Sequence, residues 1–275
     1  MKAGERYLLI GPVSRDRIIR GERVSLRTGG AVYYYARLLS YLGVEHTAVV
    51  TIAEEDLHLL EAFTEDTEII PVYREATVEF ENIYSDGDPD DRIQRSNFAE
   101  NPLYVDDIVE MAGEGWTAVL AGPLLPSDIP ISTLKFLGEG HSLYTGLQGY
   151  LRFQGNPGVS LGFSRKIWSV LDCSDAVFLD VNELGVIADE RRRALMLMGE
   201  HVDEAVVTRG SRGSFIYRRG RLMEVKAVEA VRELEPTGLG DTYMAAYVYM
   251  RQRAGPLDAG RFASMMATGK LEGKI

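Results

Sequence analysis

Short apolar segments alternate along the chain with longer segments in which apolar residues recur every three or four positions. The short segments predict strands and the longer ones predict amphipathic helices. The strands are expected at Tyr7 to Gly11, His46 to Ile52, Thr117 to Ala121, Ala176 to Leu179 and Ala205 to Thr208. The helices are expected at Ala31 to Leu42, Tyr104 to Ala112, Ile131 to Leu137, Glu183 to Met198, Thr242 to Arg253 and Asp258 to Thr268. This order predicts an α/β fold with a doubly wound, mostly parallel sheet flanked by helices.

Two segments depart from the alternation. Ile18 to Leu26 and Ala76 to Asn97 have β-rich patterns interrupted by turn residues, and each predicts a hairpin. An acidic run within the second segment, Ser85 to Asp91, is expected to join its two strands. One interpretation is that both are surface hairpins added to the edge of the sheet.

Composition narrows the class of protein. The chain has 275 residues, and its hydrophobic content of 45% is enough for a sizeable core in one large α/β domain or two smaller ones. The net charge of −11 argues against binding a phosphate backbone, so no nucleic acid is expected as partner. No apolar run reaches the roughly 20 residues that span a bilayer, so no membrane is expected. The single Cys173 excludes an internal disulfide and indicates a reducing compartment, the cytoplasm.

The run Glu235-Pro236-Thr237-Gly238-Leu239-Gly240-Asp241 leads directly into a predicted helix. A glycine-rich turn at a helix N-terminus aims unpaired backbone N–H groups at one point, and the helix dipole adds partial positive charge there. Such a site favours an anion such as a phosphate. Asp241 beside that anion is placed to accept the proton of a hydroxyl that attacks phosphorus, which indicates phosphoryl transfer. Taken alone, the run favours an ordinary turn with a capping Asp.

Two further glycine motifs occur in a fixed order before this run. Gly29-Gly30 opens the first predicted helix after Asp16, which follows the first strand where open α/β sheets bind ligands. Thr208-Arg209-Gly210-Ser211-Arg212-Gly213 links two strand-like stretches. Over almost the whole chain, these motifs resemble the ribokinase-like (PfkB) family of carbohydrate kinases.

The resemblance implies one kinase domain over residues 1–275, with a small β lid whose strands come from about 15–27 and 72–98. It implies an ATP- and Mg²⁺-dependent phosphotransferase that acts on a hydroxyl of a small sugar or polyol. Asp241 is then the base, and N–H groups of Gly238, Leu239 and Gly240 stabilise charge on the transferred phosphoryl group. A closing lid excludes water from the reaction. Relatives pair through their lid sheets, so a homodimer is expected.

The resemblance also assigns substrate-binding residues. Asp16, Gly29 and Gly30 match acceptor-binding positions of the family. The stretch from Gln148 to Arg152 resembles the Gln-Gly-x-x-Arg of inositol-kinase-like members, which assigns both end residues to an acceptor or phosphate and points to a polyol.

For the nucleotide, the run from Thr208 to Gly213 resembles the family's Thr-x-Gly-x-x-Gly. This resemblance assigns Thr208, Gly210 and Gly213 to ATP, and Arg209 adds charge there. Asn182 matches the Asn of an Asn-x-x-Glu motif that helps organise magnesium and phosphate in relatives.

Several motif positions depart from the family's pattern. Gly185 stands in place of the Glu of Asn-x-x-Glu, and the side chain of the adjacent Glu183 is expected to leave the helix in another direction. The remaining departures are Tyr34 for Asn, Gly146 for Asp, Glu235-Pro236 for Asp-Thr, and Leu239 for Ala. They leave open a catalytically weak sugar- or nucleotide-binding regulatory protein on the same fold, and a kinase for a nucleoside or vitamin precursor. The sequence assigns no metal ligands.

Overall fold

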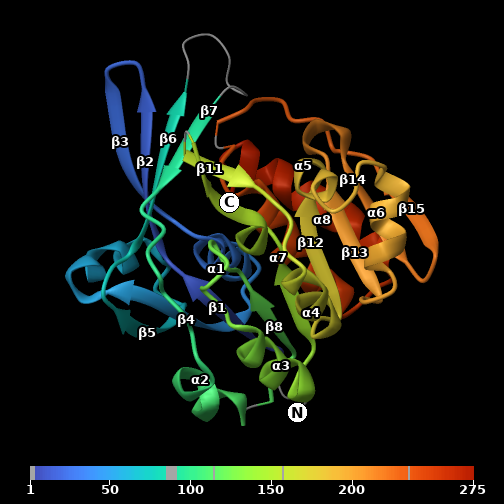
Figure 1. The fold of residues 1–275 in the computed structure, drawn as a ribbon, viewed down its shortest axis with the longest axis horizontal. Helices are drawn as coiled ribbons and strands as arrows, with labels where there is room; N and C mark the ends of the chain where they lie inside the picture. The colour runs from blue at the N-terminus through green and yellow to red at the C-terminus, as the bar shows by residue number, and fades with distance from the viewer. Residues whose placement is uncertain (1–3, 85–91, 114, 157, 235) are drawn as a thin grey trace.

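A large, mostly parallel sheet runs through the protein (Figure 1). The computed structural model describes residues 4–84, 92–113, 115–156, 158–234 and 236–275. The strand order is β15-β14-β13-β12-β9-β8-β1-β4-β5. The seven neighbours from β13 to β5 in this order are parallel, whereas β14 and β15 add two antiparallel pairings at one edge. The strands are β1 (Arg6–Pro12), β4 (Glu45–Ala53), β5 (Glu68–Arg74), β8 (Ala118–Ala121), β9 (Leu143–Gly146), β12 (Ala176–Asp180), β13 (Glu204–Thr208), β14 (Ser214–Arg218) and β15 (Arg221–Val225). The predicted doubly wound α/β fold is confirmed.

Helices cover both faces of this sheet, because neighbouring side chains of a strand point to opposite faces. In β1, Tyr7 and Leu9 face one buried cluster, while Leu8 and Ile10 face the other. The first cluster is completed by α1 (Ala31–Tyr41), α7 (Leu239–Arg251) and α8 (Pro256–Leu271). The second is completed by α2 (Val105–Ala112), α3 (Ile131–Gly140), α4 (Lys166–Asp172), α5 (Val181–Gly185) and α6 (Arg191–Met198).

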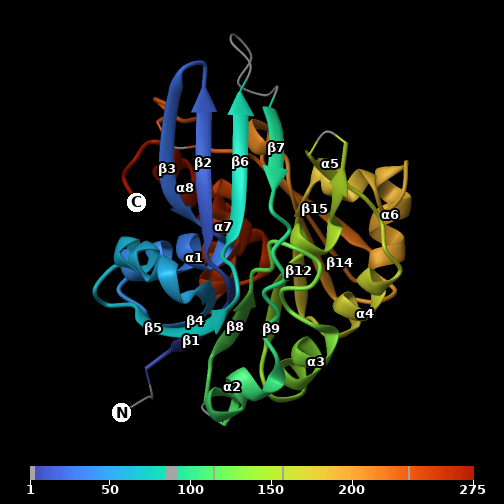
Figure 2. The same ribbon diagram turned by 60° about the vertical axis from the view of Figure 1, so that its left-hand side comes forward.

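A smaller sheet projects from the large one, as Figure 2 shows. Its order is β3-β2-β6-β7, with β2 (Ser14–Arg20), β3 (Arg23–Gly29), β6 (Val78–Tyr84) and β7 (Arg92–Ser96). A hairpin of β10 (Arg152–Gly155) and β11 (Gly158–Leu161) contacts β7. Gly158 fits so closely there that a Cβ would lie 2.2 Å from the carbonyl oxygen of Gln94. The acidic run Ser85 to Asp91 lies outside the described residues, and lid motion of this sheet stays a prediction.

The prediction of one continuous helix over Glu183 to Met198 is wrong. The segment Glu183 to Met198 forms two helices, because α5 ends at Gly185 and α6 begins at Arg191. Gly185 and the β-branched Val186 and Ile187 have low helix propensity, which weakens the helix at this point. Short 3₁₀ helices occur elsewhere at η1 (Glu54–Ala62), η2 (Gly149–Leu151) and η3 (Gly210–Arg212).

A buried carboxylate ties α7 to the large sheet. Glu204 of β13 is 3% exposed and accepts hydrogen bonds from Tyr247 at 2.8 Å and Arg251 at 3.2 Å. Arg218 of β14 pairs with the same carboxylate at 3.1 Å. The network therefore joins β13 and β14 to α7, the helix that begins at the glycine-rich turn.

We expect Glu204→Ala to lower the free energy of unfolding by about 3 kcal/mol, because it leaves the Tyr247 hydroxyl and the Arg251 guanidinium without their acceptor. Urea unfolding followed by circular dichroism measures the change. Glu200→Ala, at an exposed position, is the control and should change stability by less than about 0.5 kcal/mol. Equal losses in the two variants would contradict this expectation.

Candidate active site

The glycine-rich turn forms the start of α7. Gly238 is the N-cap, with a left-handed φ of 75°, and Asp241 lies in the first helical turn. A Cβ at position 238 would lie 2.4 Å from ring atoms of Tyr34, so only glycine fits both the backbone and the space. The first N–H groups of a helix have no intrahelical acceptor. The turn therefore presents backbone donors and a carboxylate at one point.

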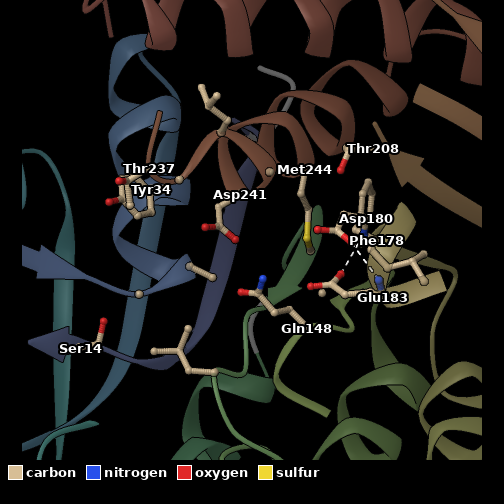
Figure 3. Close-up of a pocket in the computed structure, with 18 of the residues that line it drawn as sticks. Ser14, Tyr34, Gln148, Phe178, Asp180, Glu183, Thr208, Thr237, Asp241 and Met244 are labelled. Carbon is tan, nitrogen blue, oxygen red and sulfur yellow. Dashed lines mark hydrogen bonds between the residues drawn. The ribbon is translucent and has the colours of Figure 1, made fainter. Parts of the chain in front are cut away.

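A cavity of about 380 Å³ lies in front of this turn. It brings together residues predicted from distant motifs: Asp16, Gly30, Gln148, Arg152, Thr208, Gly210, Gly238, Leu239, Gly240 and Asp241. Figure 3 shows the Asp241 carboxylate and the Gln148 amide pointing into it from α7 and from the loop after β9. The parallel strands end at this edge of the sheet, which is why residues so far apart in the sequence meet here.

The electrostatic setting of Asp241 suits a base. Burial raises the pKa of its carboxyl to about 6; Arg152 opposes this shift and Asp16 adds to it. At neutral pH the group is mostly ionised, yet it binds a proton more readily than an exposed Asp does. A carboxylate with this pKa can accept a proton during a reaction near pH 7.

Asp16 lies on β2 of the small sheet, at one end of the cavity. Its Oδ1 accepts a hydrogen bond from the Ser14 hydroxyl at 2.7 Å. A Cβ at Gly29 would lie 2.3 Å from its Oδ2, so the glycine leaves room for this carboxylate. Gly30, with φ of 103°, caps α1 and lines the cavity itself. Of the predicted glycine pair, Gly30 thus borders the cavity, whereas Gly29 packs behind Asp16.

Arg152 links the cavity to the small sheet. Arg152 as a whole is 6% exposed, and its guanidinium donates to the Leu124 carbonyl at 3.2 Å and lies 4.7 Å from the centre of the Phe80 ring on β6. It also lowers the pKa of Asp241 by attraction. The predicted Gln148 and Arg152 therefore both face the cavity.

Glu183 is a cavity residue that the sequence reasoning missed. Its side chain is 3% exposed, lines the cavity and accepts from the Asp180 N–H at 2.8 Å, instead of pointing away as expected. Asp180 in turn accepts from the N–H groups of Asn182 and Glu183, which completes a capping box. Burial and the neighbouring Asp180 hold the pKa of Glu183 well above its ordinary value. The Asp180-x-x-Glu183 spacing was the signal that could have located it.

A second cavity, of about 820 Å³, adjoins the first. Both are lined by Thr208, Gly210, Pro236, Leu239 and Gly240. The second extends between the Gly210–Gly213 turn and α8, where apolar atoms come from Val228, Tyr243, Ala267 and Leu271. Position 213 favours glycine for two reasons: its φ of 84° is left-handed, and a Cβ there would lie 2.0 Å from the Val225 carbonyl oxygen.

Two predicted ligand contacts lie outside both cavities. Arg209 pairs with Glu224 at 2.6 Å, and its guanidinium lies 3.7 Å from the centre of the Phe215 ring. These neighbours engage the charge that the sequence assigned to phosphate. Asn182 is exposed on α5, because the capping box turns Glu183 inward in its place. Glu235 lies outside the described residues.

No cluster of three or more His, Cys, Asp or Glu side chains suited to a metal occurs among the described residues. Mg²⁺ in phosphoryl-transfer sites is commonly held by one or two carboxylates together with substrate phosphates. Asp180 and Glu183 line the first cavity and supply that kind of ligand.

Among the residues that the structure describes, no helix is long and apolar enough to cross a membrane.

Solved structures of kinases share this fold. A sulfate complex of a pyrophosphate-dependent kinase in the ribokinase family superposes with a TM-score of 0.83 at 22% identity, covering 96% of this chain and 95% of that one. Ribokinase from Arabidopsis thaliana, in complex with ribose and ATP, has a TM-score of 0.76 at 17% identity and covers 98% and 93%. The protein thus has the ribokinase-like fold.

Sequence comparison adds a family match. Residues 141–272 match the model described as pfkB family carbohydrate kinase, a range that holds Arg152, Glu183 and the Asp241 turn. A nucleoside kinase from Methanocaldococcus jannaschii is 41% identical over 49 residues, which are 18% of this chain and 16% of that relative. These findings confirm the resemblance to ribokinase-like (PfkB) carbohydrate kinases and support the prediction of a kinase.

We expect Gly238→Ala to weaken ADP binding by about tenfold or more, because a left-handed alanine is strained and its Cβ meets the Tyr34 ring. Isothermal titration calorimetry measures the affinity. Gly220→Ala is a matched control: its φ of 78° is also left-handed, but a Cβ there meets nothing within 4 Å. If both variants bind ADP as the wild type does, the turn does not hold the phosphates.

Proposed function

We propose that the protein is a kinase that transfers a phosphoryl group from ATP to a hydroxyl of a small sugar or polyol. The observation that carries this proposal is the position of Asp241. It lies behind a left-handed glycine at a helix N-terminus, and the two cavities meet at that turn. An acceptor in the first cavity and a phosphate donor in the second would approach each other beside this carboxylate.

The polar lining of the first cavity supports a hydroxyl-rich acceptor. Asp16, Asn82, Gln94, Gln148 and Arg152 supply carboxylate, amide and guanidinium groups to one small space. Such groups hydrogen-bond to hydroxyls, and Arg152 can also hold a phosphate through its planar fork.

The second cavity supports a nucleotide as donor. Its volume of about 820 Å³ and the apolar atoms beside α8 suit a base, while Thr208 and Gly210 line both cavities, where the phosphates would reach the acceptor. Pyrophosphate has no apolar part that would use this lining. The distinction matters because one structural neighbour is a pyrophosphate-dependent kinase complexed with a pyrophosphate analog and myo-inositol.

In the proposed reaction, the acceptor oxygen forms a bond to the γ-phosphorus of ATP while the bond from that phosphorus to the bridging oxygen breaks. Asp241 takes the proton of the acceptor hydroxyl, and ADP leaves. N–H groups of Gly238, Leu239 and Gly240 stabilise the charge on the moving phosphoryl group. Mg²⁺, when bound with the nucleotide, supplies positive charge to the phosphates, and Asp180 and Glu183 are the carboxylates that would hold it or its waters.

A nucleoside acceptor is the second candidate. The 41% identity of one stretch to a nucleoside kinase favours it, and aromatic side chains of Tyr34, Phe80 and Phe178 line the first cavity, where they could stack on a base. A regulatory protein that binds sugar or nucleotide without turnover is a third candidate. An assay of ADP release across a panel of acceptors distinguishes it from both kinases.

The homodimer and the cytoplasmic location stay predictions. The face of the small sheet opposite the cavity exposes Val24, Leu26 and Ile93, with exposed fractions of 50%, 67% and 40%. Apolar side chains on an exposed sheet favour pairing with a second copy.

We expect Asp241→Asn to lower kcat by about 10²-fold or more while ADP affinity stays near that of the wild type, because the amide cannot accept the proton. A coupled ADP-release assay with ATP or pyrophosphate, across hexoses, pentoses, inositols and nucleosides, measures the activity and identifies donor and acceptor. Asp258→Asn, an exposed acid in the first turn of α8, is the control. Full activity of Asp241→Asn would exclude the residue as base, and wild-type silence with retained ADP binding would favour the regulatory protein.

The pH dependence of kcat/KM should report the same carboxyl. Because the ionised form is the base, we expect kcat/KM to rise with pH, to reach half of its maximum at about pH 6, and to level off only above that pH. Asp16→Asn removes a repulsion and should move the inflection to lower pH, whereas Arg152→Met removes an attraction and should move it to higher pH. Arg165→Met, at an exposed position, should leave it in place. Shifts of Asp16→Asn and Arg152→Met in the same direction would contradict the assignment.

A further inference from the structure

Two loops that follow neighbouring strands of the large sheet meet at the first cavity. β8 and β9 are paired in parallel and lie side by side (Figure 2). The 122–130 loop follows β8, and the 147–152 segment follows β9. The segment supplies Gln148 and Arg152 to the lining of the first cavity, and the loop supplies Leu124. The acceptor side of the candidate site therefore depends on how the 122–130 loop is held.

A buried carboxyl holds this loop. Three residues of the loop are prolines, which have no N–H with which to form backbone hydrogen bonds. The N–H groups of Leu124 and Leu125 donate instead to Oδ2 of Asp128, at 2.8 and 2.7 Å. Asp128 is 0% exposed, and its own carbonyl accepts from the Leu103 N–H at 2.7 Å. The carboxyl thus joins both ends of the loop in a place that water does not reach.

The 147–152 segment packs directly on the loop. A Cβ at Gly149 would lie 2.4 Å from the Pro123 carbonyl oxygen, so the close approach of the two backbones requires glycine. The buried Tyr150 hydroxyl donates to the Ile129 carbonyl at 2.6 Å. A shift of the loop would therefore shift the segment that supplies the acceptor-binding side chains.

Leu124 connects Asp128 to Arg152. Its N–H is bound by the Asp128 carboxyl, and its carbonyl accepts from Nη1 of Arg152 at 3.2 Å. Among the described residues, the charges that shift the pKa of Asp241 are those of Arg152 and Asp16. An effect of Asp128 on Asp241 therefore has to pass through the position of Arg152.

We propose that Asp128 is a positioning residue for the proposed kinase, whose carboxyl holds the 122–130 loop so that the Leu124 carbonyl keeps the Arg152 guanidinium in the first cavity. Asp128 does not line that cavity itself, so its action is indirect. Without the carboxyl, two buried N–H groups lose their acceptor, and the loop has to move to bring them to water. Arg152 is then held less closely, attracts Asp241 less and binds the acceptor less well.

The inference rests on the proposed function for its kinetic readout only. The pKa of Asp241 can be measured without turnover, from the pH dependence of its ¹³C carboxyl NMR signal, which Asp241→Asn identifies. We expect Asp128→Ala to raise this pKa, in the same direction as Arg152→Met but by less, because the guanidinium remains and is only less closely held.

The conservative variant should restore the wild-type value. Burial raises the pKa of Asp128 to about 7, so its carboxyl is mostly neutral at the pH where Asp241 titrates. Asp128→Asn is neutral as well, and its amide oxygen can accept the same two N–H groups. The pKa of Asp241 in Asp128→Asn should therefore stay near that of the wild type.

A double-mutant comparison shows whether the effect passes through Arg152. In the Arg152→Met background, Asp128→Ala should change the pKa of Asp241 no further. Asp175→Ala is the matched control, because Asp175 also binds a backbone N–H with its carboxylate, that of Leu143 at 2.8 Å, before β12. This variant should leave the pKa of Asp241 unchanged.

The kinetic arm uses the acceptor that the ADP-release assay identifies. We expect Asp128→Ala to raise the KM for that acceptor by about tenfold, which is the loss expected when a hydrogen bond from a charged group is weakened. The affinity for ADP should stay near that of the wild type, because Arg152 lines the first cavity and not the second. Asp128→Asn should restore most of the acceptor KM.

An unchanged or lowered pKa of Asp241 in folded Asp128→Ala would overturn the inference, and so would an equal rise in the Arg152→Met background. If circular dichroism shows that Asp128→Ala does not fold, Gly149→Ala decides, because its Cβ pushes the 147–152 segment away from Pro123. A raised pKa in Gly149→Ala supports the role of the loop, and an unchanged pKa refutes it. A wild type that phosphorylates no acceptor, while Asp128→Ala still raises the pKa of Asp241, refutes the proposed function alone.

Discussion

The contact between Gly238 and the ring of Tyr34 is the constraint on which the site depends. Only a glycine fits at that point, and its left-handed backbone sets the direction in which α7 begins. The direction of α7 determines where its free N–H groups and Asp241 point. Because α7 packs against α1, β12 and α8, the hydrophobic core itself holds the geometry of the candidate site. The contacts that stabilise α7, the buried Glu204 network among them, therefore also fix the position of the candidate site.

The parts of the molecule that follow from repeating patterns could be predicted from the sequence. In β1, alternate residues face different helix layers, and this two-sided burial produces the continuous apolar runs that identify parallel strands. The meeting of Asp16, Arg152 and Asp241 followed from motif order, because the ends of parallel strands share one edge of the sheet. The position of Gly238 at the start of α7 could be predicted because a glycine-rich run directly precedes the helical pattern there.

The sequence is least informative where a tertiary neighbour decides how a side chain is placed. Arg209 stands in a motif that the sequence assigns to phosphate, and its side chain pairs with the Glu224 carboxylate on β15 and lies over the Phe215 ring on β14. Glu183 turns inward because Asp180 offers it a backbone N–H, a local bond that competes with the direction expected for a regular helix.

The two cavities have a common wall at Thr208, Gly210, Pro236, Leu239 and Gly240. A single molecule that joins an acceptor-like group to a nucleoside through a phosphate chain could therefore occupy both cavities at once. Once one half is bound, the other half is held at a high effective concentration beside its own cavity, so the affinity of the joined molecule can far exceed that of either half. Under the proposed function, the common wall makes this protein a target for bisubstrate inhibitors, and the linker length that gives the highest affinity measures the distance between the donor and acceptor sites.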